Sequence, residues 1–439
     1  MIKGRTPNSN NTNNAWNVNT DGSANNNNVS NSNGVVPAIE ITLGRLSRFL
    51  IEHIPFYFKE LLTCLICEMG ELEWRCTFLF GESSAINSST IKDMIDSFEN
   101  IFTYERLLRS FNECKRGQLW KGSVIDFNAN YVEKITRLEQ SILDGTYEPF
   151  PDNINYIHER GKTRKIHSQH IRDRIVHKVV NQDILIPTFH RRFIRYNSAS
   201  QKKKGVDFAM KSFKMHLNRA YRKWGTDFYI LSIDIRKYFE NIPHDYIEKL
   251  LRKEIKDERI IRLCMSSMKS YDGGKGLGLG SEINQTYALL CLNEFDHIMK
   301  ERFHIKEYAR YMDDIYIIHN DKEFLHEIIE FAKSYLSGLR LEMNEKKTNI
   351  IPIKNGITFL GFRWKLTKTG HVILVPKKQT IFRNKKKLRK LKLKLDSGVF
   401  TFEEIQNSRA SMLGNLGRSN CHKVITNMDN YFNKIFIES

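Results

Sequence analysis

The chain has 439 residues, of which 41% are hydrophobic, so it can form two or three domains with real cores. Its net charge of +19 favours a polyanionic partner, and nucleic acid fits better than a membrane because no long apolar run occurs. The seven cysteines are scattered, odd in number and follow no secretory signal, which predicts reduced thiols in a cytoplasmic protein. Cys64, Cys67 and Cys76 could suggest zinc, but no second pair follows at finger spacing.

Residues 1–93 are expected to form an N-terminal extension. Thirteen asparagines lie between Asn8 and Asn33, and such a polar segment cannot bury enough apolar surface to order itself. Residues 46–62 carry apolar patches compatible with a helix, but residues 38–93 contain no motif that points to a function.

Two helices and a basic hairpin are predicted next. Apolar residues at helical spacing indicate helices over 104–114 and 129–143. Two extended runs around a glycine predict a β-hairpin over 157–166, and a helix starts at Ile171. Cations on the hairpin and the helix start form a candidate clamp for a triphosphate, with a solvated basic hairpin as the alternative. The candidate clamp residues are Lys162, Arg164, Lys165 and Arg172.

A basic loop over 197–205 leads into a predicted helix over 206–223. Cations in such a loop are expected to meet nucleic-acid phosphates, which give affinity without sequence choice. The candidate residues are Lys202, Lys203 and Lys204.

Three carboxylates lie at strand ends in the middle of the chain. An apolar strand pattern over 230–235 leads to Asp234, and the run Tyr311-Met312-Asp313-Asp314 predicts a hairpin turn between apolar arms. Adjacent acids repel each other, and a divalent ion such as Mg²⁺ is the usual compensation. A solvated Asp-Asp turn is the alternative for the pair alone. With the third carboxylate, the set could hold two Mg²⁺ for in-line phosphoryl transfer.

Glycines and helices surround these acids. A glycine-rich loop over 273–280 would let the backbone approach a base pair closely. A helix is predicted for 283–303, and a polar, helix-like run over 295–309 precedes the hairpin. Beyond the hairpin, helices are predicted over 322–336 and 377–394, the latter basic and amphipathic.

The run Tyr311–Asp314 and the strand that ends at Asp234 resemble the palm motifs of the reverse transcriptase family. The resemblance implies an α+β fold of the right-hand polymerase type, preceded by the disordered Asn-rich segment. It implies fingers over 94–230, a palm with an antiparallel sheet over 231–364 and a helical thumb over 365–439. It also implies RNA-directed DNA polymerase activity with an RNA template, a DNA or RNA primer, deoxynucleoside triphosphates and two Mg²⁺ ions.

The resemblance assigns roles within the palm. The side chains of Asp234, Asp313 and Asp314 and the backbone carbonyl of Ile235 would hold the metal ions. Phe239 would stack under the incoming sugar, where a ribose 2′-OH would clash, and a core aromatic ring is the alternative for this residue.

Two further motifs match the family. Residues 339–348 fit its Leu-x-Leu-Asn-x-x-Lys-Thr motif, in which Lys347 would protonate the leaving pyrophosphate; a surface lysine, or Lys346 in its place, is the alternative. The family's primer-grip hairpin corresponds to Phe359, Leu360 and Gly361. On the predicted thumb helix, cations would rest in the minor groove of a template–primer hybrid, with a solvated face as the alternative. The residues chosen there are Lys385, Lys386 and Arg389.

The glycine-rich loop indicates a subgroup. Most reverse transcriptases have Gln-Gly, three residues and Ser-Pro, whereas this chain has Leu279-Gly280, three residues and Asn284-Gln285. This resembles the enzymes of diversity-generating retroelements, except that Asn284 replaces a Ser. The resemblance implies a nucleotide contact by Gln285, error-prone copying and a small basic accessory protein.

The subgroup also suggests an interpretation of the extension. Residues 15–22 and 33–37 resemble the C-terminal end of the target proteins of these elements. The Asn-rich stretch is therefore interpreted as a translated template repeat, and Met94 as a candidate natural start.

Alternatives from other groups stay open. A phage-defence or retron-type reverse transcriptase would share the palm motifs. A non-catalytic RNA-binding protein with a polymerase-like fold would belong to another class, and a DNA-templated polymerase is a third alternative.

Overall fold

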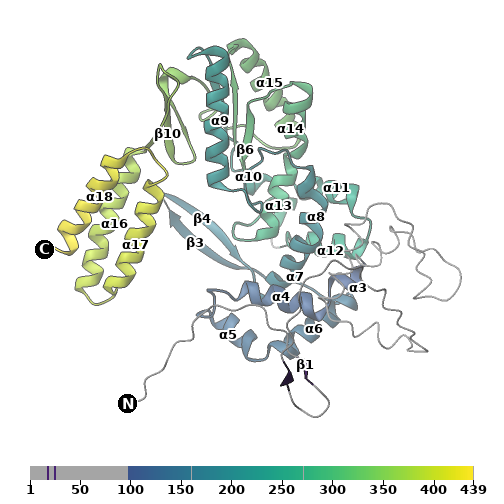
Figure 1. Ribbon diagram of the computed structural model, residues 1–439. Coiled ribbons are helices and arrows are strands. Elements are labelled where there is room, and N and C mark those ends of the chain that lie inside the picture. Colours follow the sequence, from purple (N-terminus) through teal and green to yellow (C-terminus); the bar gives the residue numbers. More distant parts are fainter. Residues whose placement is uncertain (1–16, 19–23, 26–96, 160, 270, 439) are drawn as a thin grey trace. The chain divides into compact units, whose positions relative to one another are not determined.

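The computed structural model describes residues 17–18, 24–25, 97–159, 161–269 and 271–438 (Figure 1). The chain separates into two compact units, Met1–Ile86 and Asn87–Ser439. In the first unit, strands β1 (Asn17–Val18) and β2 (Ala24–Asn25) pair antiparallel. The apolar patches, Cys64, Cys67, Cys76 and Met94 lie outside the described residues, as does most of the Asn-rich stretch.

The second unit begins with helices. Helix α4 (Tyr104–Cys114) has the predicted bounds, because Leu107, Phe111 and Cys114 form one buried stripe along it. The accompanying helices are α3 (Phe98–Ile101), α5 (Gly122–Ala129) and α6 (Tyr131–Leu143).

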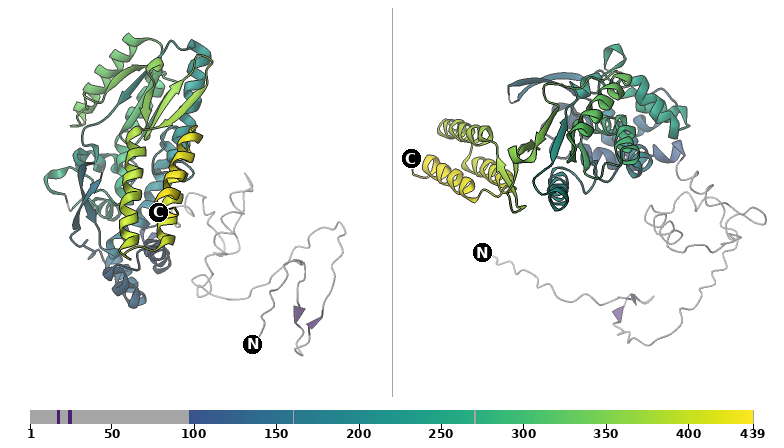
Figure 2. Two further views of the ribbon diagram at one scale, coloured as in Figure 1. Left: turned by 90° about the vertical axis from the view of Figure 1, so that its left-hand side faces the viewer. Right: turned by 90° about the horizontal axis from the view of Figure 1, so that it is seen from above.

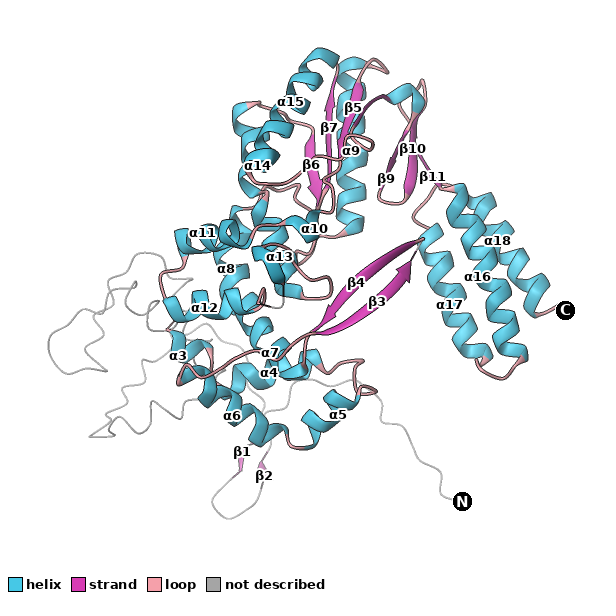
Figure 3. Ribbon diagram, turned by 180° about the vertical axis from the view of Figure 1, so that it is seen from behind, coloured by secondary structure: helices cyan, strands magenta, loops and turns pink. Residues whose placement is uncertain are grey.

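The predicted basic hairpin is confirmed and is longer than expected. Strands β3 (Asn153–Glu159) and β4 (Lys162–Ser168) form a separate two-stranded sheet, which stands out from the helices in Figure 3. Helix α7 (Ile171–Val179) starts where predicted and continues through the π-helical turn η2 (Val180–Leu185) into α8 (Ile186–Phe189).

A four-stranded antiparallel sheet forms the centre of this unit. Its strands lie in the order β6 (Tyr308–Tyr311), β7 (Asp314–His319), β5 (Tyr229–Ile233) and β8 (Asn349–Pro352). Helix α9 (Val206–Trp224) packs on one face, against Ile230 and Ile318. The other face presents Ile233 and Ile317 to helices that include α15 (Lys322–Gly338). Because both faces are covered, the sheet is a rigid platform.

The long helix predicted for 283–303 is divided. Helix α13 (Glu282–Cys291) ends at Leu292, and α14 (Asn293–His297) and the π-helical turn η5 (Ile298–Arg302) follow. The expected helix-like run to Ala309 is wrong, because residues 308–311 pair with β7 as strand β6. Tyr308 and Ala309 are buried in the sheet, and this tertiary packing overrides the local pattern.

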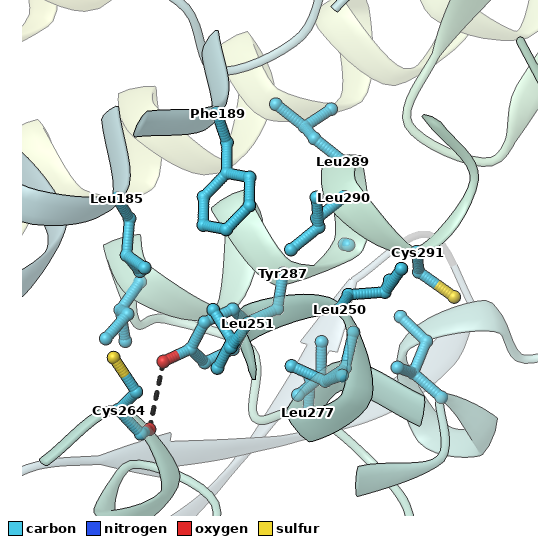
Figure 4. Packing of buried hydrophobic residues seen from close by; sticks show 14 of the residues in the cluster. Leu185, Phe189, Leu250, Leu251, Cys264, Leu277, Tyr287, Leu289, Leu290 and Cys291 are labelled. Carbon is cyan, nitrogen blue, oxygen red and sulfur yellow. Dashed lines mark hydrogen bonds between the residues drawn. The ribbon is translucent and has the colours of Figure 1, made fainter. Parts of the chain in front are cut away.

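Buried side chains fasten these helices to one another (Figure 4). Helices α11 (His244–Glu254) and α12 (Glu258–Ser266) pack against α13, with Leu251 and Leu289 fully buried. Tyr287 is also fully buried, and its hydroxyl donates to the carbonyl of Cys264 at 2.9 Å. Each buried leucine contributes roughly 2 kcal/mol, so this cluster stabilises the region that carries the sheet.

A smaller sheet and a helical bundle complete the unit. Strands β9 (Ile357–Phe359), β10 (Phe362–Leu366) and β11 (Val372–Pro376) form an antiparallel sheet, so residues 372–376 of the expected thumb belong to a sheet. Figure 2 shows the three helices that follow running side by side around their own core. They are α16 (Lys378–Asp396), α17 (Phe402–Leu416) and α18 (His422–Phe436). Among the described helices, none combines the length and the apolarity that crossing a membrane requires.

Candidate active site

The strand register brings Asp234 and Asp314 together. Ile233 pairs with Ile315 across β5 and β7, so extending the antiparallel register by one residue sets Asp234 opposite Asp314. Residues directly opposite each other lie on the same face of a sheet, with Cβ atoms about 5 Å apart. Two carboxylates from distant parts of the sequence therefore meet at one end of the sheet.

The third carboxylate lies in the turn between β6 and β7. Tyr311 pairs with Asp314, which leaves Met312 and Asp313 as a two-residue loop, and the predicted hairpin is thereby confirmed. Met312 has a φ of +56°, a left-handed conformation that costs a residue with a side chain about 1–2 kcal/mol. Backbone strain of this kind is often kept at functional sites, where the surrounding structure holds it.

The pKa values show that the three charges interact. Burial, together with the negative charges of Asp313 and Asp234, raises the pKa of Asp314 to about 6. The side chain of Asp314 reaches solvent, but protein atoms crowd it on its other sides. Burial and the charge of Asp234 also raise the pKa of Asp313, against the opposing effects of Lys347 and Arg164.

Asp234 is held by the segment after α15. The side-chain amide of Asn344 donates to Asp234 Oδ1 at 2.7 Å, and the backbone N–H of Asn344 donates to the carbonyl of Asp234 at 2.8 Å. The Lys347 ammonium donates to both carboxylate oxygens, at 3.0 and 2.8 Å. Sequence reasoning gave Asn344 no role of its own, although its fixed place in the Leu-x-Leu-Asn-x-x-Lys-Thr motif was a usable signal.

The donor set fits a hard divalent cation. Asp234, Asp313 and Asp314 offer carboxylate oxygens, which Mg²⁺ prefers, and the raised pKa values of Asp313 and Asp314 indicate that these two are short of compensating charge. In this conformation, no group of three or more His, Cys, Asp or Glu side chains among the described residues is arranged to hold a metal. Lys347 instead pairs with Asp234. The carboxylate of Asp234 can coordinate an ion only after this lysine has released it.

The hairpin β3–β4 supplies one cation to this site. Arg164 lies close enough to Asp313 to lower its pKa. Lys165 is exposed, but successive residues of a strand point to opposite faces, so Lys165 projects away from the side that Arg164 faces. Whether both residues clamp one triphosphate stays a prediction, and the side chain of Lys162 lies outside the described part of the chain.

Arg172 is engaged in a structural network at the start of α7. Its guanidinium pairs with the buried Asp173 at 3.2 Å and donates to the carbonyl of Glu148. It also stacks over the ring of Phe150, 3.7 Å from the ring centre. The structure thus places Arg172 at the base of the hairpin and holds its guanidinium there.

The glycine-rich loop packs beside Phe239, the residue predicted to stack under the sugar of the incoming nucleotide. Phe239, in helix α10 (Tyr238–Asn241), is half-buried against the main core. Its carbonyl accepts from the N–H of Leu277 at 2.6 Å, and the N–H of Gly276 donates to the carbonyl of Ile242 at 2.8 Å. These bonds fix the loop against the segment that follows Asp234.

Glycine is required at one position of this loop. A Cβ on Gly278 would lie 1.4 Å from the hydroxyl of Tyr271. The side-chain amide of Asn284 donates to the carbonyl of Gly278 at 3.1 Å from a fully buried position. The neighbouring Gln285 accepts a hydrogen bond from Ser200, so helix α13 is joined to the basic loop.

The expected primer-grip residues form a tight turn. Phe359 pairs with Phe362, which leaves Leu360 and Gly361 as a two-residue loop with φ values of +49° and +85°. Two successive positive φ values are typical of the type I′ turns that match the twist of a hairpin. Phe359 is buried and packs against Phe213, so its ring anchors the hairpin.

Residues 153–364, from strand β3 into strand β10, match the family model described as reverse transcriptase (RNA-dependent DNA polymerase). They include all three candidate carboxylates. This segment is therefore similar to reverse transcriptases.

Two curated proteins are similar to the chain over longer stretches. The chain is 26% identical over 277 residues to protein YkfC of Escherichia coli (strain K12), covering 54% of this chain and 72% of the relative. It is 24% identical over 291 residues to the group II intron-encoded protein LtrA of Lactococcus lactis subsp. cremoris, covering 61% of this chain and 47% of the relative. The chain thus spans about half the length of the intron-encoded protein.

Solved structures with a partial likeness include two fungal telomerases. The telomerase from Candida albicans, solved with a fragment of telomeric RNA, aligns with a TM-score of 0.40 and 13% identity, covering 70% of this chain and 65% of that one. The apo telomerase from Candida tropicalis aligns with a TM-score of 0.42 and 13% identity, covering 66% and 60%.

The basic residues predicted to contact nucleic acid divide into exposed and engaged side chains. Lys202 and Lys203 are exposed. Lys204 instead turns inward and donates to the carbonyl of Asn197 at 3.0 Å, so its predicted phosphate contact is not available in this conformation. On α16, Lys386 and Arg389 are exposed, whereas Lys385 lies over the ring of Tyr431 at 4.8 Å from the ring centre.

Proposed function

We propose that this protein is an RNA-directed DNA polymerase that adds deoxynucleotides to a primer on an RNA template. The observation that supports this most strongly is the meeting of Asp234, Asp313 and Asp314 at one end of the central sheet, where the pKa values of Asp313 and Asp314 are raised. Three carboxylates at a shared site are suited to binding divalent ions for nucleotidyl transfer.

The residues that would hold two Mg²⁺ are the three carboxylates, with the backbone carbonyl of Ile235 as a further ligand. When bound, such ions promote attack by the primer 3′-OH and stabilise the charge of the transferring phosphate. Asn344 keeps Asp234 in place through its side-chain amide and its backbone N–H.

Lys347 has two roles in this proposal. In the absence of metal, it neutralises Asp234 through two hydrogen bonds. Once the carboxylate is released, the ammonium is free to donate a proton to the leaving pyrophosphate. Lys346 is exposed and makes neither contact with Asp234, which favours Lys347.

Side chains from three elements would receive the nucleotide. Arg164 faces the carboxylates and would pair with the triphosphate, with Lys162 as a second candidate and Lys165 and Arg172 dependent on movement of the hairpin. Phe239 would select against a ribose 2′-OH, and Gln285 would contact the base pair from helix α13.

The proposed template and primer contacts use the exposed cations. Phe359, Leu360 and Gly361 would form the primer grip. Lys202 and Lys203 before α9 would meet phosphates, as would Lys386 and Arg389 on α16. In this reading the second unit is divided into fingers (94–230), palm (231–364) and thumb (365–439).

Within the family, we place the protein with the polymerases of diversity-generating retroelements. Leu279-Gly280 and Asn284-Gln285 support this placement, and it implies a small basic accessory protein and a cytoplasmic location. A retron-type or phage-defence enzyme is the second candidate. An adenine-rich repeat in the flanking DNA that matches a target gene would favour the diversity-generating polymerase. Its absence would favour the retron-type or phage-defence enzyme.

Primer extension on defined templates tests the proposed activity. With a DNA primer, Mg²⁺ and deoxynucleoside triphosphates, we expect the wild-type protein to extend on RNA. Binding of the RNA hybrid without extension would indicate a non-catalytic RNA-binding protein instead. Extension on DNA alone would indicate a DNA-templated polymerase.

A further inference from the structure

A fully buried ion pair lies directly behind the catalytic turn. Arg310, in strand β6, and Asp296, in helix α14, have no solvent-exposed side-chain surface, and their closest nitrogen and oxygen atoms are 2.6 Å apart. Neither residue was singled out from the sequence. A usable signal was present for Arg310 alone, because this charge stands between Tyr308-Ala309 and Tyr311-Met312.

The guanidinium of Arg310 makes contacts in three directions. Nε donates to both carboxylate oxygens of Asp296, at 2.8 and 3.0 Å, and Nη2 donates to Oδ2 at 2.6 Å. Nη2 also donates to the carbonyl of Leu289, in the last turn of α13, at 2.9 Å. Nη1 donates to the carbonyl of Met312 at 3.2 Å, so the planar fork joins two helices to the turn.

The surroundings hold this pair in a single arrangement. The hydroxyl of Tyr308 donates to Asp296, which fixes the carboxylate from the opposite side. The backbone of Arg310 is bound as well, because its N–H donates to Tyr196 at 3.1 Å and its carbonyl accepts from Ser198 at 3.0 Å. The guanidinium therefore has little freedom to move.

Stability alone does not explain why two charges are buried here. The desolvation of both ions opposes their attraction, and apolar residues of similar volume often stabilise a core as well or better. An apolar residue could not, however, donate a hydrogen bond to the Met312 carbonyl. That carbonyl belongs to the peptide that links the left-handed Met312 to Asp313.

We propose that Arg310, held by Asp296, is a positioning residue for the catalytic turn. Its hydrogen bond to the Met312 carbonyl fixes the peptide that leads into Asp313, and so the directions in which Asp313 and Asp314 present their oxygens. The pair prepares the turn for divalent ions without touching substrate or metal. This inference rests on the proposed function, and its test includes metal binding so that the two can fail separately.

The first test removes both charges and keeps the volume, in the double variant Asp296→Leu with Arg310→Met. We expect a melting temperature near that of the wild type, a deoxynucleotide KM within about twofold and a kcat roughly 10- to 100-fold lower, the scale of a small misplacement of a reacting group. Titration with Mn²⁺ followed by electron paramagnetic resonance should show weaker binding. The control is Arg192→Ala with Glu254→Ala, which removes a solvent-exposed fork-to-fork pair but leaves the Arg192 carbonyl, the group that contacts His297 beside Asp296, in place; it should leave kcat and Mn²⁺ binding unchanged.

The second test is Arg310→Lys, which keeps the charge but has only one donor group in place of the fork. We expect the same loss of kcat and of Mn²⁺ affinity, and this variant decides the question if the double variant does not fold. Wild-type kcat and Mn²⁺ affinity in either folded variant would overturn the positioning role. If the wild type extends no primer, the proposed function fails, and the Mn²⁺ titrations alone decide whether Arg310 prepares the turn.

Discussion

At the scale of single residues, Asp314 shows most clearly how crowded negative charge affects the site. Its carboxyl is crowded by protein and faces two other negative charges, so its pKa of about 6 lies well above the ordinary value of an aspartic acid. A carboxyl whose pKa is raised on folding binds its proton more tightly in the folded state. Its ionisation therefore destabilises the metal-free protein progressively as the pH rises from about 4 to above 6.

We expect Asp314→Asn to be more stable than the wild type above pH 6 in the presence of EDTA. After allowance for the solvent that reaches this side chain, the difference should be of order 1 kcal/mol, and it should vanish below about pH 4. Urea unfolding of both proteins between pH 3 and 8 measures the difference, and saturating Mg²⁺ should reverse it. Equal stabilities at pH 7.5 would contradict the crowding of negative charge around Asp314.

At the scale of the element, the β9–β10 turn holds the residues of the proposed primer grip. The β9–β10 turn has two positive φ values, and a Cβ on Gly361 would meet no neighbour within 4 Å. Substituting Gly361 therefore tests backbone conformation without a steric clash.

We expect Gly361→Ala to lower the free energy of unfolding by about 1 kcal/mol, because a Cβ is disfavoured in the left-handed region. It should also raise the KM for the template–primer, which steady-state kinetics measures. Gly398 is a matched control, with a φ of +70° and equally open surroundings at the end of α16. If Gly398→Ala raised this KM as much as Gly361→Ala, the turn would have no special part in holding the primer.

The elements show what the sequence could and could not predict. The bounds of α4 and both hairpins followed from apolar periodicity and turn residues, which act locally. The break after α13 did not, because the carbonyl of Leu289 is satisfied by Arg310 from another part of the chain. Arg164 and Lys165 are successive residues of a paired strand and therefore point to opposite faces of the hairpin. Their positive charges alone do not show this difference.

At the scale of the whole molecule, the sequence located the carboxylates that meet at the end of the sheet better than it located the groups that hold them. Asp234, Asp313 and Asp314 were recognisable because acids at the ends of apolar strands are conspicuous. The side chain that holds Asp234 is Asn344, 110 residues further along the chain. The side chain that holds the turn is Arg310, two residues before Met312. Only the assembled sheet shows which carboxylate or carbonyl each of them binds.

The charge of the molecule agrees with the same account. The net charge of +19 gives long-range attraction to nucleic acid, which promotes association without choosing a sequence. In the proposed function, the chemical step takes place at a small acidic site within this basic chain, where the carboxylates would repel one another until a cation is supplied.

Single-turnover incorporation of one deoxynucleotide on an RNA template tests the central claim most directly. The comparison is between the wild type, Asp313→Asn and Asp227→Asn, the last being an exposed aspartate in the loop before β5. We predict a rate roughly 10²–10³-fold lower for Asp313→Asn, the scale of losing one group that stabilises a transition state, and an unchanged rate for Asp227→Asn. Incorporation by Asp313→Asn at the wild-type rate would contradict the assignment of this carboxylate, and with it the proposed active site.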